Sequence, residues 1–135
     1  MSEKMREILF RGKRVGDYDW AYGCYYKQTA FYGDPVEVHN IITSQEDLEY
    51  DMAMEYTSVV PETVGQFTGL TDKNGKKIFE GDILEFRRGR THAVKFEDGA
   101  YIFTGTAIPV RYADKFKVIG NIHDNPELLK EAPNV

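Results

Sequence analysis

A basic run in the second half of the chain has the residue types that bind anions. Residues 87–95 read RRGRTHAVK, with no acid between the cations. The cations are Arg87, Arg88, Arg90 and Lys95. Tyr101 and Phe103 follow on the next expected strand, where their rings could stack on unpaired bases. The run is therefore expected to be a charged hairpin tip that keeps an edge strand soluble, and the alternative is a weak, salt-dependent nucleic-acid site.

Other residues that could bind phosphate or a metal ion lack the spacing that such sites require. Residues 69–77, GLTDKNGKK, have five residues between the glycines where a phosphate-binding loop has four, and Lys77 stands where that loop needs Ser or Thr. Asp72 and Asn74 lack the downstream glutamate of a calcium loop. The histidines have no metal-ligand partner at the usual spacing: His39, His92 and His123. We expect a turn here and no metal site.

Cys24 is the single cysteine, so an internal disulfide is excluded, which suits a reducing compartment. Period-2 geometry places it on one strand face with Trp20, Tyr22 and Tyr26. This predicts a packed thiol on a buried face rather than a nucleophile. No Gly-x-Ser-x-Gly motif is present either. We expect a protein that is not an enzyme and has no cofactor.

Composition favours a β-rich protein of one domain or two very small ones. The 135 residues are 41% apolar and 13% aromatic, and aromatic residues favour strands. Residues 1–60 carry six Lys/Arg against eleven Asp/Glu, and residues 61–135 carry eleven of each, so the second half suits a polyanion better. No apolar run approaches the roughly 20 residues of a membrane span, and the start has no signal-peptide core. We expect a cytoplasmic protein without membrane contact.

Residues 1–60 are expected to form an N-terminal β subdomain. Residues 6–28 predict a hairpin and residues 36–43 a further strand. Residues 44–55 favour a short acidic helix, because Ser44 could cap it and Leu48, Met52 and Tyr56 recur at i, i+4 and i+8. An acidic loop is the alternative. Its acids are candidate contacts for a partner protein: Glu46, Asp47, Glu49, Asp51 and Glu55.

Residues 61–135 are expected to form a second subdomain of short antiparallel strands. Asp98-Gly99 between two alternating runs marks a hairpin. Further turns are expected at Gly69, Asn74, Gly75, Gly81 and Asp82, with Asp82 accepting a backbone N–H to hold a corner. Asn125 and Pro126 predict a short C-terminal helix, capped by Asn125. The expected fold class is mainly β.

Three blocks of the sequence resemble the YopX family of phage and prophage proteins. They are MREILFRGKRV with WAYGCYY, then PETVGQFTGLTDKNGKKIFEGDIL, and finally VIGNIHDNPELL. The resemblance runs from Met5 to Leu129, and the middle block is its most specific part. It implies a phage or prophage origin, a mainly β fold and self-association, and it brings no catalytic residues. The stretch EGDILEF…HAVKFEDGAYIF is in addition similar to small SH3-like β-barrels.

The aromatic content gives a second reason to expect self-association. Eight Phe, nine Tyr and one Trp are difficult to bury inside so short a chain, and Tyr and Trp are enriched at interfaces. We expect a homo-oligomer. The first functional hypothesis is an interaction module that engages a host or phage protein through the acidic segment. The second is weak nucleic-acid binding through residues 87–95.

Overall fold

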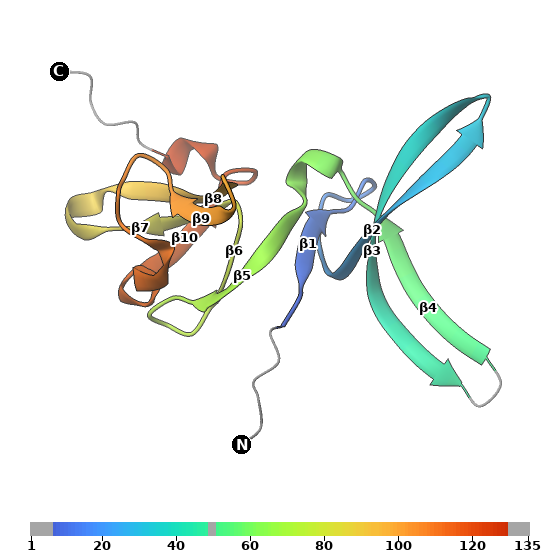
Figure 1. Cartoon of the computed structure of the whole chain (residues 1–135), viewed down its shortest axis with the longest axis horizontal. Helices are drawn as coiled ribbons and strands as arrows, with labels where there is room; N and C mark the ends of the chain where they lie inside the picture. The colour runs from blue at the N-terminus through green and yellow to red at the C-terminus, as the bar shows by residue number, and fades with distance from the viewer. Residues whose placement is uncertain (1–6, 49–50, 130–135) are drawn as a thin grey trace. The chain divides into compact units, whose positions relative to one another are not determined.

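The protein is mainly β, in a computed structural model that describes residues 7–48 and 51–129, with the backbone alone described at residues 32, 44–48 and 51–54. Its strands form antiparallel sheets joined by turns and short 3₁₀ segments (Figure 1). The chain forms two compact units that divide within β5 (Gly65–Thr71). We call Glu7–Gln66 the N-terminal unit and the described chain from Phe67 onward the C-terminal unit. The sequence analysis places the division between residues 60 and 61.

The N-terminal unit is a sheet with the strand order β4-β3-β2-β1, and β1 pairs on its other side with the start of β5. A long hairpin turns at Gly33, whose φ of 90° lies in the left-handed region that glycine adopts readily. A 3₁₀ turn, η1 (Pro61–Thr63), leads into β5. The strands are β1 (Phe10–Lys13), β2 (Trp20–Tyr32), β3 (Asp34–Leu48) and β4 (Asp51–Ser58).

The helix expected over residues 44–55 is wrong, because residues 44–48 belong to β3 and residues 51–55 belong to β4. The two strands pair antiparallel from Ser44↔Glu55 to Leu48↔Asp51, after a register shift next to Ile42. The spacing of Leu48, Met52 and Tyr56 explains the error: steps of four residues fit one face of a helix. In the structure, however, Leu48 lies on β3, whereas Met52 and Tyr56 lie on β4, which pairs antiparallel with it.

The core of the N-terminal unit is small and lies on one face of this sheet. Ala21, Ile41 and Val59 are buried, and Tyr25 is among the partly buried residues that pack against them. Cys24 is exposed, so the packed thiol expected from the sequence is wrong. Alternation along β2 gives the reason: the core takes the face of Ala21 and Tyr25, and Cys24 lies on the opposite face.

The C-terminal unit holds a hairpin and a four-stranded sheet with the order β10-β7-β8-β9. The rest of β5 pairs with β6, and Ile102 on β9 forms an isolated bridge with Pro109. Among the described strands the sheet is open, with β10 and β9 at its edges. The strands are β6 (Lys77–Phe79), β7 (Asp82–Glu85), β8 (Thr91–Glu97), β9 (Ala100–Phe103) and β10 (Lys117–Asn121).

Turns of the C-terminal unit lie where the glycines and short polar residues stand. The Asp98-Gly99 hairpin is confirmed, since both residues have positive φ (52° and 81°), as a type I′ turn requires. Gly81 has φ 93°, and the buried Asp82 accepts a hydrogen bond from the Phe79 N–H at 2.7 Å through Oδ2. Gly75 also has positive φ, in the turn after β5. Gly69 has positive φ too, but it lies within β5, where the pairing with β6 changes register, so the turn predicted there is wrong.

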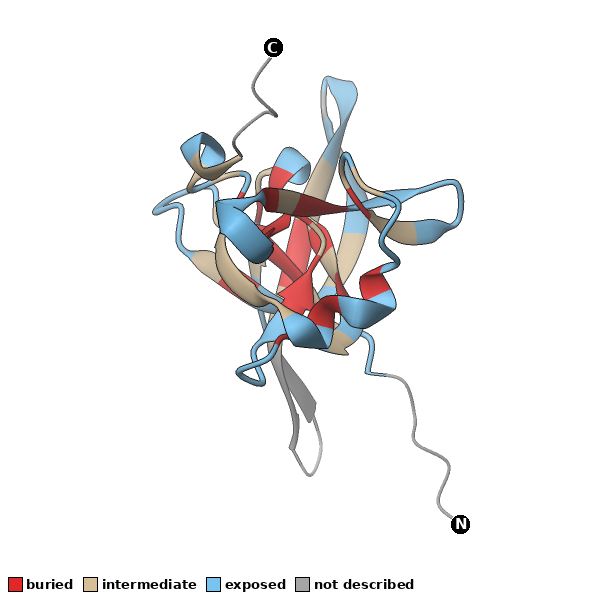
Figure 2. Ribbon diagram, turned by 90° about the vertical axis from the view of Figure 1, so that its left-hand side faces the viewer, coloured by how far each residue is buried: buried red, intermediate tan, exposed pale blue. Residues whose placement is uncertain are grey.

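The core of the C-terminal unit is larger than that of the N-terminal unit. Buried residues come from β6 to β9 and from η3 (Val110–Lys115), and Figure 2 shows buried ribbon giving way to exposed residues at hairpin ends. They are Ile78, Leu84, Phe86, Val94, Phe103, Val110 and Ala113.

The C-terminal helix is a single 3₁₀ turn, η4 (Pro126–Leu128). Asn125 precedes it but makes no side-chain cap, so the predicted cap is wrong. Its Oδ1 instead accepts a hydrogen bond from the Asn121 N–H at 3.3 Å. No helix in the described part of the chain is long and apolar enough to cross a membrane.

Gly23 provides a test of the N-terminal sheet. A Cβ at this position would lie 1.8 Å from the Ile42 carbonyl oxygen on the paired strand, and the φ of 157° is unfavourable for other residues. Gly23→Ala should lower the free energy of unfolding by roughly 3 kcal/mol or more. Urea unfolding followed by the fluorescence of Trp20, the only tryptophan, measures this. Gly16→Ala is the matched control, since a Cβ there meets nothing within 4 Å. Equal stability of both variants would contradict the close approach at Gly23.

Candidate nucleic-acid interface

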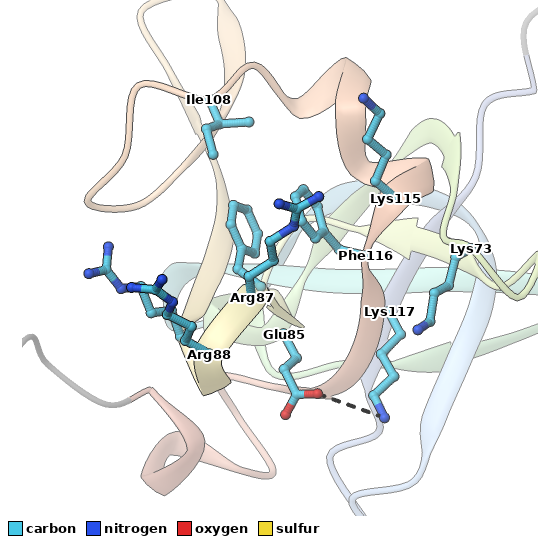
Figure 3. A pocket seen from close by; sticks show the side chains of 10 residues that line it. Lys73, Glu85, Arg87, Arg88, Ile108, Lys115, Phe116 and Lys117 are labelled. Carbon is cyan, nitrogen blue, oxygen red and sulfur yellow. Dashed lines mark ion pairs between the residues drawn. The ribbon is translucent and has the colours of Figure 1, made fainter.

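The C-terminal unit contains a pocket of about 620 Å³ whose lining is mostly cationic (Figure 3). Its residues come from the turn after β5, the end of β7 and the loop that follows it, the loop after β9 with η3, and the start of β10. The lining residues are Lys73, Glu85, Phe86, Arg87, Arg88, Arg90, Ile108, Lys115, Phe116 and Lys117. All of them lie in one unit, so the unit carries the pocket by itself.

Three of the cations stand on one short loop. The β7–β8 pairing ends at Glu85↔Thr91, and the loop is closed by a hydrogen bond from the Phe86 N–H to the Arg90 carbonyl at 2.6 Å. The loop includes the 3₁₀ segment η2 (Arg87–Gly89). Its side chains are exposed, because the tip of a two-stranded hairpin has no neighbouring strand to cover it.

Arg88 has an unusual backbone conformation for a bulky residue. Its φ of 64° and ψ of 29° are left-handed, and Gly89 after it also has positive φ. Such a conformation costs a non-glycine residue roughly 1–2 kcal/mol, and strain of this kind concentrates at ligand sites. The strained residue here is one of the cations that line the pocket.

An aromatic pair forms the apolar wall of the pocket. The rings of Phe86 and Phe116 stack with centroids 3.9 Å apart and planes 5° from parallel. Phe86 is buried and meets the rings of Phe103 and His92 edge-on, at 5.0 and 4.5 Å. Phe116 is only half-buried, and it lines the pocket.

The other cations are linked to Phe116, either as its neighbours in sequence or by a hydrogen bond to its backbone carbonyl. Lys115 and Lys117 flank it in sequence, and the Lys73 N–H donates to the Phe116 carbonyl at 2.9 Å. In Figure 3 the labelled arginines and the labelled lysines lie on different sides of the pocket. Glu85, the one acid in the lining, lies opposite Lys117 in the β7–β10 register and pairs with its Nζ at 3.8 Å.

Asp72 holds Lys73 in place. Its buried carboxylate accepts hydrogen bonds from the backbone N–H groups of Asn74, Lys76 and Val118, at 2.8, 2.9 and 2.9 Å. Burial by itself would raise the pKa of Asp72, but these hydrogen bonds, helped by the charge of Lys76, outweigh it and lower the pKa below its ordinary value. Asp72 thereby fastens the turn after β5 to β10, at the lysine side of the pocket.

The charge balance of the pocket favours anions. Six cations line it against one carboxylate, and that carboxylate is already paired with Lys117. Within the described residues no ion pair is recorded for Lys73, Arg87, Arg88, Arg90 or Lys115. Cations gathered around a concavity with apolar walls focus a positive potential into it.

The basic run predicted from the sequence divides between two places. Arg87, Arg88 and Arg90 line the pocket, whereas Lys95 and Tyr101 do not. Lys95 lies on β8 and pairs with Glu97 at 3.9 Å, and Tyr101 on β9 packs edge-on against Phe96 at 5.0 Å.

Sequence reasoning missed the lysine side of the pocket and Phe116. Lys115, Phe116 and Lys117 form a Lys-Phe-Lys alternation that could have been noticed as two cations flanking a ring. No sequence pattern points to Lys73, because its place in the pocket depends on the hydrogen bond to Phe116, more than forty residues further along the chain.

The other candidate residues lie elsewhere. Of the acidic set, Glu55 is exposed on β4, while Glu49 and the side chains of Glu46, Asp47 and Asp51 fall outside the described residues. His39 Nδ1 lies 2.6 Å from the Tyr25 hydroxyl, and His92 Nδ1 lies 2.6 Å from the Thr104 carbonyl. Within the described ranges, no group of three or more His, Cys, Asp or Glu side chains is arranged to hold a metal ion.

Two comparisons with known proteins find a match. Residues 10–130 match the family model described as YopX protein. The crystal structure of protein EF1440 from Enterococcus faecalis is similar to this chain, with 26% sequence identity and a TM-score of 0.62, over 93% of this chain and 100% of that chain. A search of curated proteins gives no match.

Asp72→Asn should destabilise the C-terminal unit by about 1–3 kcal/mol near neutral pH, because an amide NH₂ cannot accept the hydrogen bonds that a carboxylate oxygen accepts. A lowered pKa in the folded state adds stability that is present above the unfolded-state pKa of about 3.9 and is lost as pH falls through the folded pKa. Urea unfolding by circular dichroism at about pH 7 and about pH 3 should therefore show the wild-type advantage shrinking in acid. An advantage that stays constant over this range would contradict the role assigned to the carboxylate.

Proposed function

We propose a function for this chain, which belongs to the YopX family: it is a non-enzymatic binding module that binds single-stranded nucleic acid through the C-terminal unit. The observation that carries the proposal is the pocket in which six cations surround a stacked phenylalanine pair. Cations that follow a phosphate backbone, next to aromatic rings that accept bases, are the usual means of binding single strands.

The chemistry of the lining supports binding rather than catalysis. The lining residues are Lys, Arg, Phe, Ile and a single Glu. Lysine and arginine side chains donate hydrogen bonds to phosphate, and arginine does so with two parallel N–H groups. The one group that could accept a proton, Glu85, faces Lys117. The lining therefore supports contact with an anion more directly than proton transfer.

A single strand fits better than a duplex. Bases of a single strand are unpaired and can leave the backbone to stack on a side chain. The accessible part of Phe116 offers such a surface between the arginine loop and the lysines. Because every base has a flat face, we expect little sequence preference.

The finer features expected from the sequence belong to the same proposal. We propose an SH3-like small barrel for the C-terminal unit, supported by its short antiparallel strands and its tight hairpins. We also propose a phage or prophage origin and action in the host cytoplasm, supported by the resemblance described above. No metal or other cofactor is part of the proposed binding.

A second candidate function is self-association with recognition of a host or phage protein. The observation that favours it is the face of the N-terminal sheet opposite the core. Cys24, Ile42 and Tyr56 lie opposite one another across β2, β3 and β4. Tyr56 is 60% exposed, and Tyr22 next to them on β2 is 46% exposed. Exposed tyrosines on a sheet are typical of interfaces.

Removing the arginines of the pocket should weaken binding to a single strand. We expect Arg87→Ala/Arg88→Gly/Arg90→Ala to bind a 3′-labelled oligothymidylate of about 12 nucleotides about tenfold or more weakly. Glycine is chosen at position 88 because it adopts the left-handed backbone there without strain. Fluorescence anisotropy between about 50 and 200 mM salt should also show the slope of log K against log salt falling by about 2, at about 0.7 per lost contact.

Lys95→Ala is the matched control, since it removes a cation of the same basic run that lies outside the pocket. It should leave affinity and salt slope within about twofold of wild type. An equal loss of affinity in the control and the triple variant would show that binding depends on the overall positive charge of the protein rather than on the pocket. Wild-type binding by the triple variant would overturn the proposed function.

Tyr56→Ser tests the second candidate function. If the sheet face joins copies of the chain, the wild type should sediment as an oligomer and the variant should shift towards the monomer mass at the same concentration. Tyr18→Ser is the control, as Tyr18 is equally exposed at 59% but lies in the turn between β1 and β2. A wild type that sediments as a monomer at every concentration would rule out this interface.

A further inference from the structure

We infer that the basic pocket holds a terminal phosphate monoester of its ligand, with the adjoining nucleotide against Phe116, rather than an internal phosphodiester of a strand passing by. The inference rests on the proposed function, because it specifies which part of a nucleic acid enters the same pocket. The shared chemistry is a phosphate monoester next to a base, and either the end of a strand or a free nucleotide supplies it.

The number of cations is the first reason. An internal phosphodiester carries one negative charge, whereas a phosphate monoester carries about 1.5 to 2 near neutral pH and has three strong acceptor oxygens. Five pocket cations have no ion pair recorded among the described residues, and all five line one concavity. A monoester compensates this charge better than a single diester does.

The size of the pocket is the second reason. A volume of about 620 Å³ lies within the range of about 300–1,000 Å³ in which pockets enclose small ligands. Such a volume can hold one or two nucleotides, but it cannot hold an extended strand of many nucleotides. The lining also comes from different sides of the pocket, with arginines on one and lysines on the other (Figure 3).

The arginine loop is the third reason. Three arginines within four positions offer several planar forks to one phosphate group, and bidentate N–H pairs match its oxygens. The loop holds Arg88 in a left-handed conformation that is unfavourable for its residue type. The strain at Arg88 is explained if this loop conformation directs the arginine side chains towards one phosphate group of the ligand.

The experiment compares three oligothymidylates of equal length, each labelled on an internal base: one with a 5′-phosphate, one with a 3′-phosphate, and one with hydroxyls at both ends. We expect a terminal phosphate at one end to raise the affinity of the wild-type protein about tenfold over the hydroxyl strand. The triple arginine variant should lose this increment, and Lys95→Ala should keep it. Unlabelled thymidine 5′-monophosphate and 3′-monophosphate, added as competitors, show whether a free nucleotide supplies the same group.

Glu85→Gln gives an independent readout that does not depend on a loss of folding. Removing the one carboxylate of the lining frees Lys117, so the affinity increment due to the terminal phosphate should grow, by roughly twofold to fivefold. A neutral glutamine keeps the size of the side chain. Lys95→Ala again serves as the variant that should not change the increment.

The outcomes separate the two claims. If all three strands bind equally and binding still depends on the pocket arginines, the monoester inference is wrong and the proposed function stands. If the free monophosphates bind through the pocket arginines but no strand binds, the monoester chemistry is supported and single-strand binding is wrong. If neither strands nor monophosphates bind, both are overturned.

Discussion

The stack of Phe86 on Phe116 is the contact on which the basic pocket of the C-terminal unit depends. It joins the end of β7 to the beginning of β10 with rings 3.9 Å apart. Every cation of the pocket is attached to one of these two residues: the three arginines follow Phe86, two lysines flank Phe116, and Lys73 is hydrogen-bonded to the Phe116 carbonyl. Because the rings pack edge-on against Phe103 in the core, mutually repelling charges are held close together, with Glu85 as the one counter-charge in the pocket lining.

The two units obtain their stability in different ways. The N-terminal unit has a core of three buried residues and depends on long antiparallel ladders, in which β2 and β3 exchange hydrogen bonds over many residues. The C-terminal unit has shorter strands and a larger core, and single polar residues fix its corners: Asp72 and Asp82 each accept hydrogen bonds from backbone N–H groups. This difference matters for the proposed binding, since a packed core supports the pocket while its arginines remain exposed to solvent.

Much of this fold can be predicted from local sequence, because strand alternation and turn residues act over a few positions. The Asp98-Gly99 hairpin and the mainly β class follow from such patterns. The segment over residues 44–55 could not be assigned in this way, because its spacing of four residues fits a single helix, whereas residues 44–48 and 51–55 belong to two strands that pair with each other. Cys24 shows a related limit: alternation groups Cys24 with its aromatic neighbours, but it does not say which face the core occupies.

Only the arginine part of the candidate site could be predicted from the sequence, for a similar reason. The arginines are adjacent in sequence, so their grouping follows from one short loop. Lys73 and Phe116 meet only because a turn after β5 is fastened to β10 by Asp72, and no spacing in the sequence encodes that contact. Lys95 is close to the arginines in sequence, yet it lies on β8 outside the pocket lining and pairs with Glu97.

The bridge between Ile102 and Pro109 affects how the open sheet behaves in a crowded cell. An edge strand such as β9 would ordinarily be a template on which another extended chain can add, the first step towards fibrous aggregates. Here the chain returns and covers part of that edge itself, and it does so with a residue that has no N–H to offer a further strand. The sheet therefore ends in a residue that cannot extend the ladder, which protects the protein from polymerising through β9 without closing the sheet.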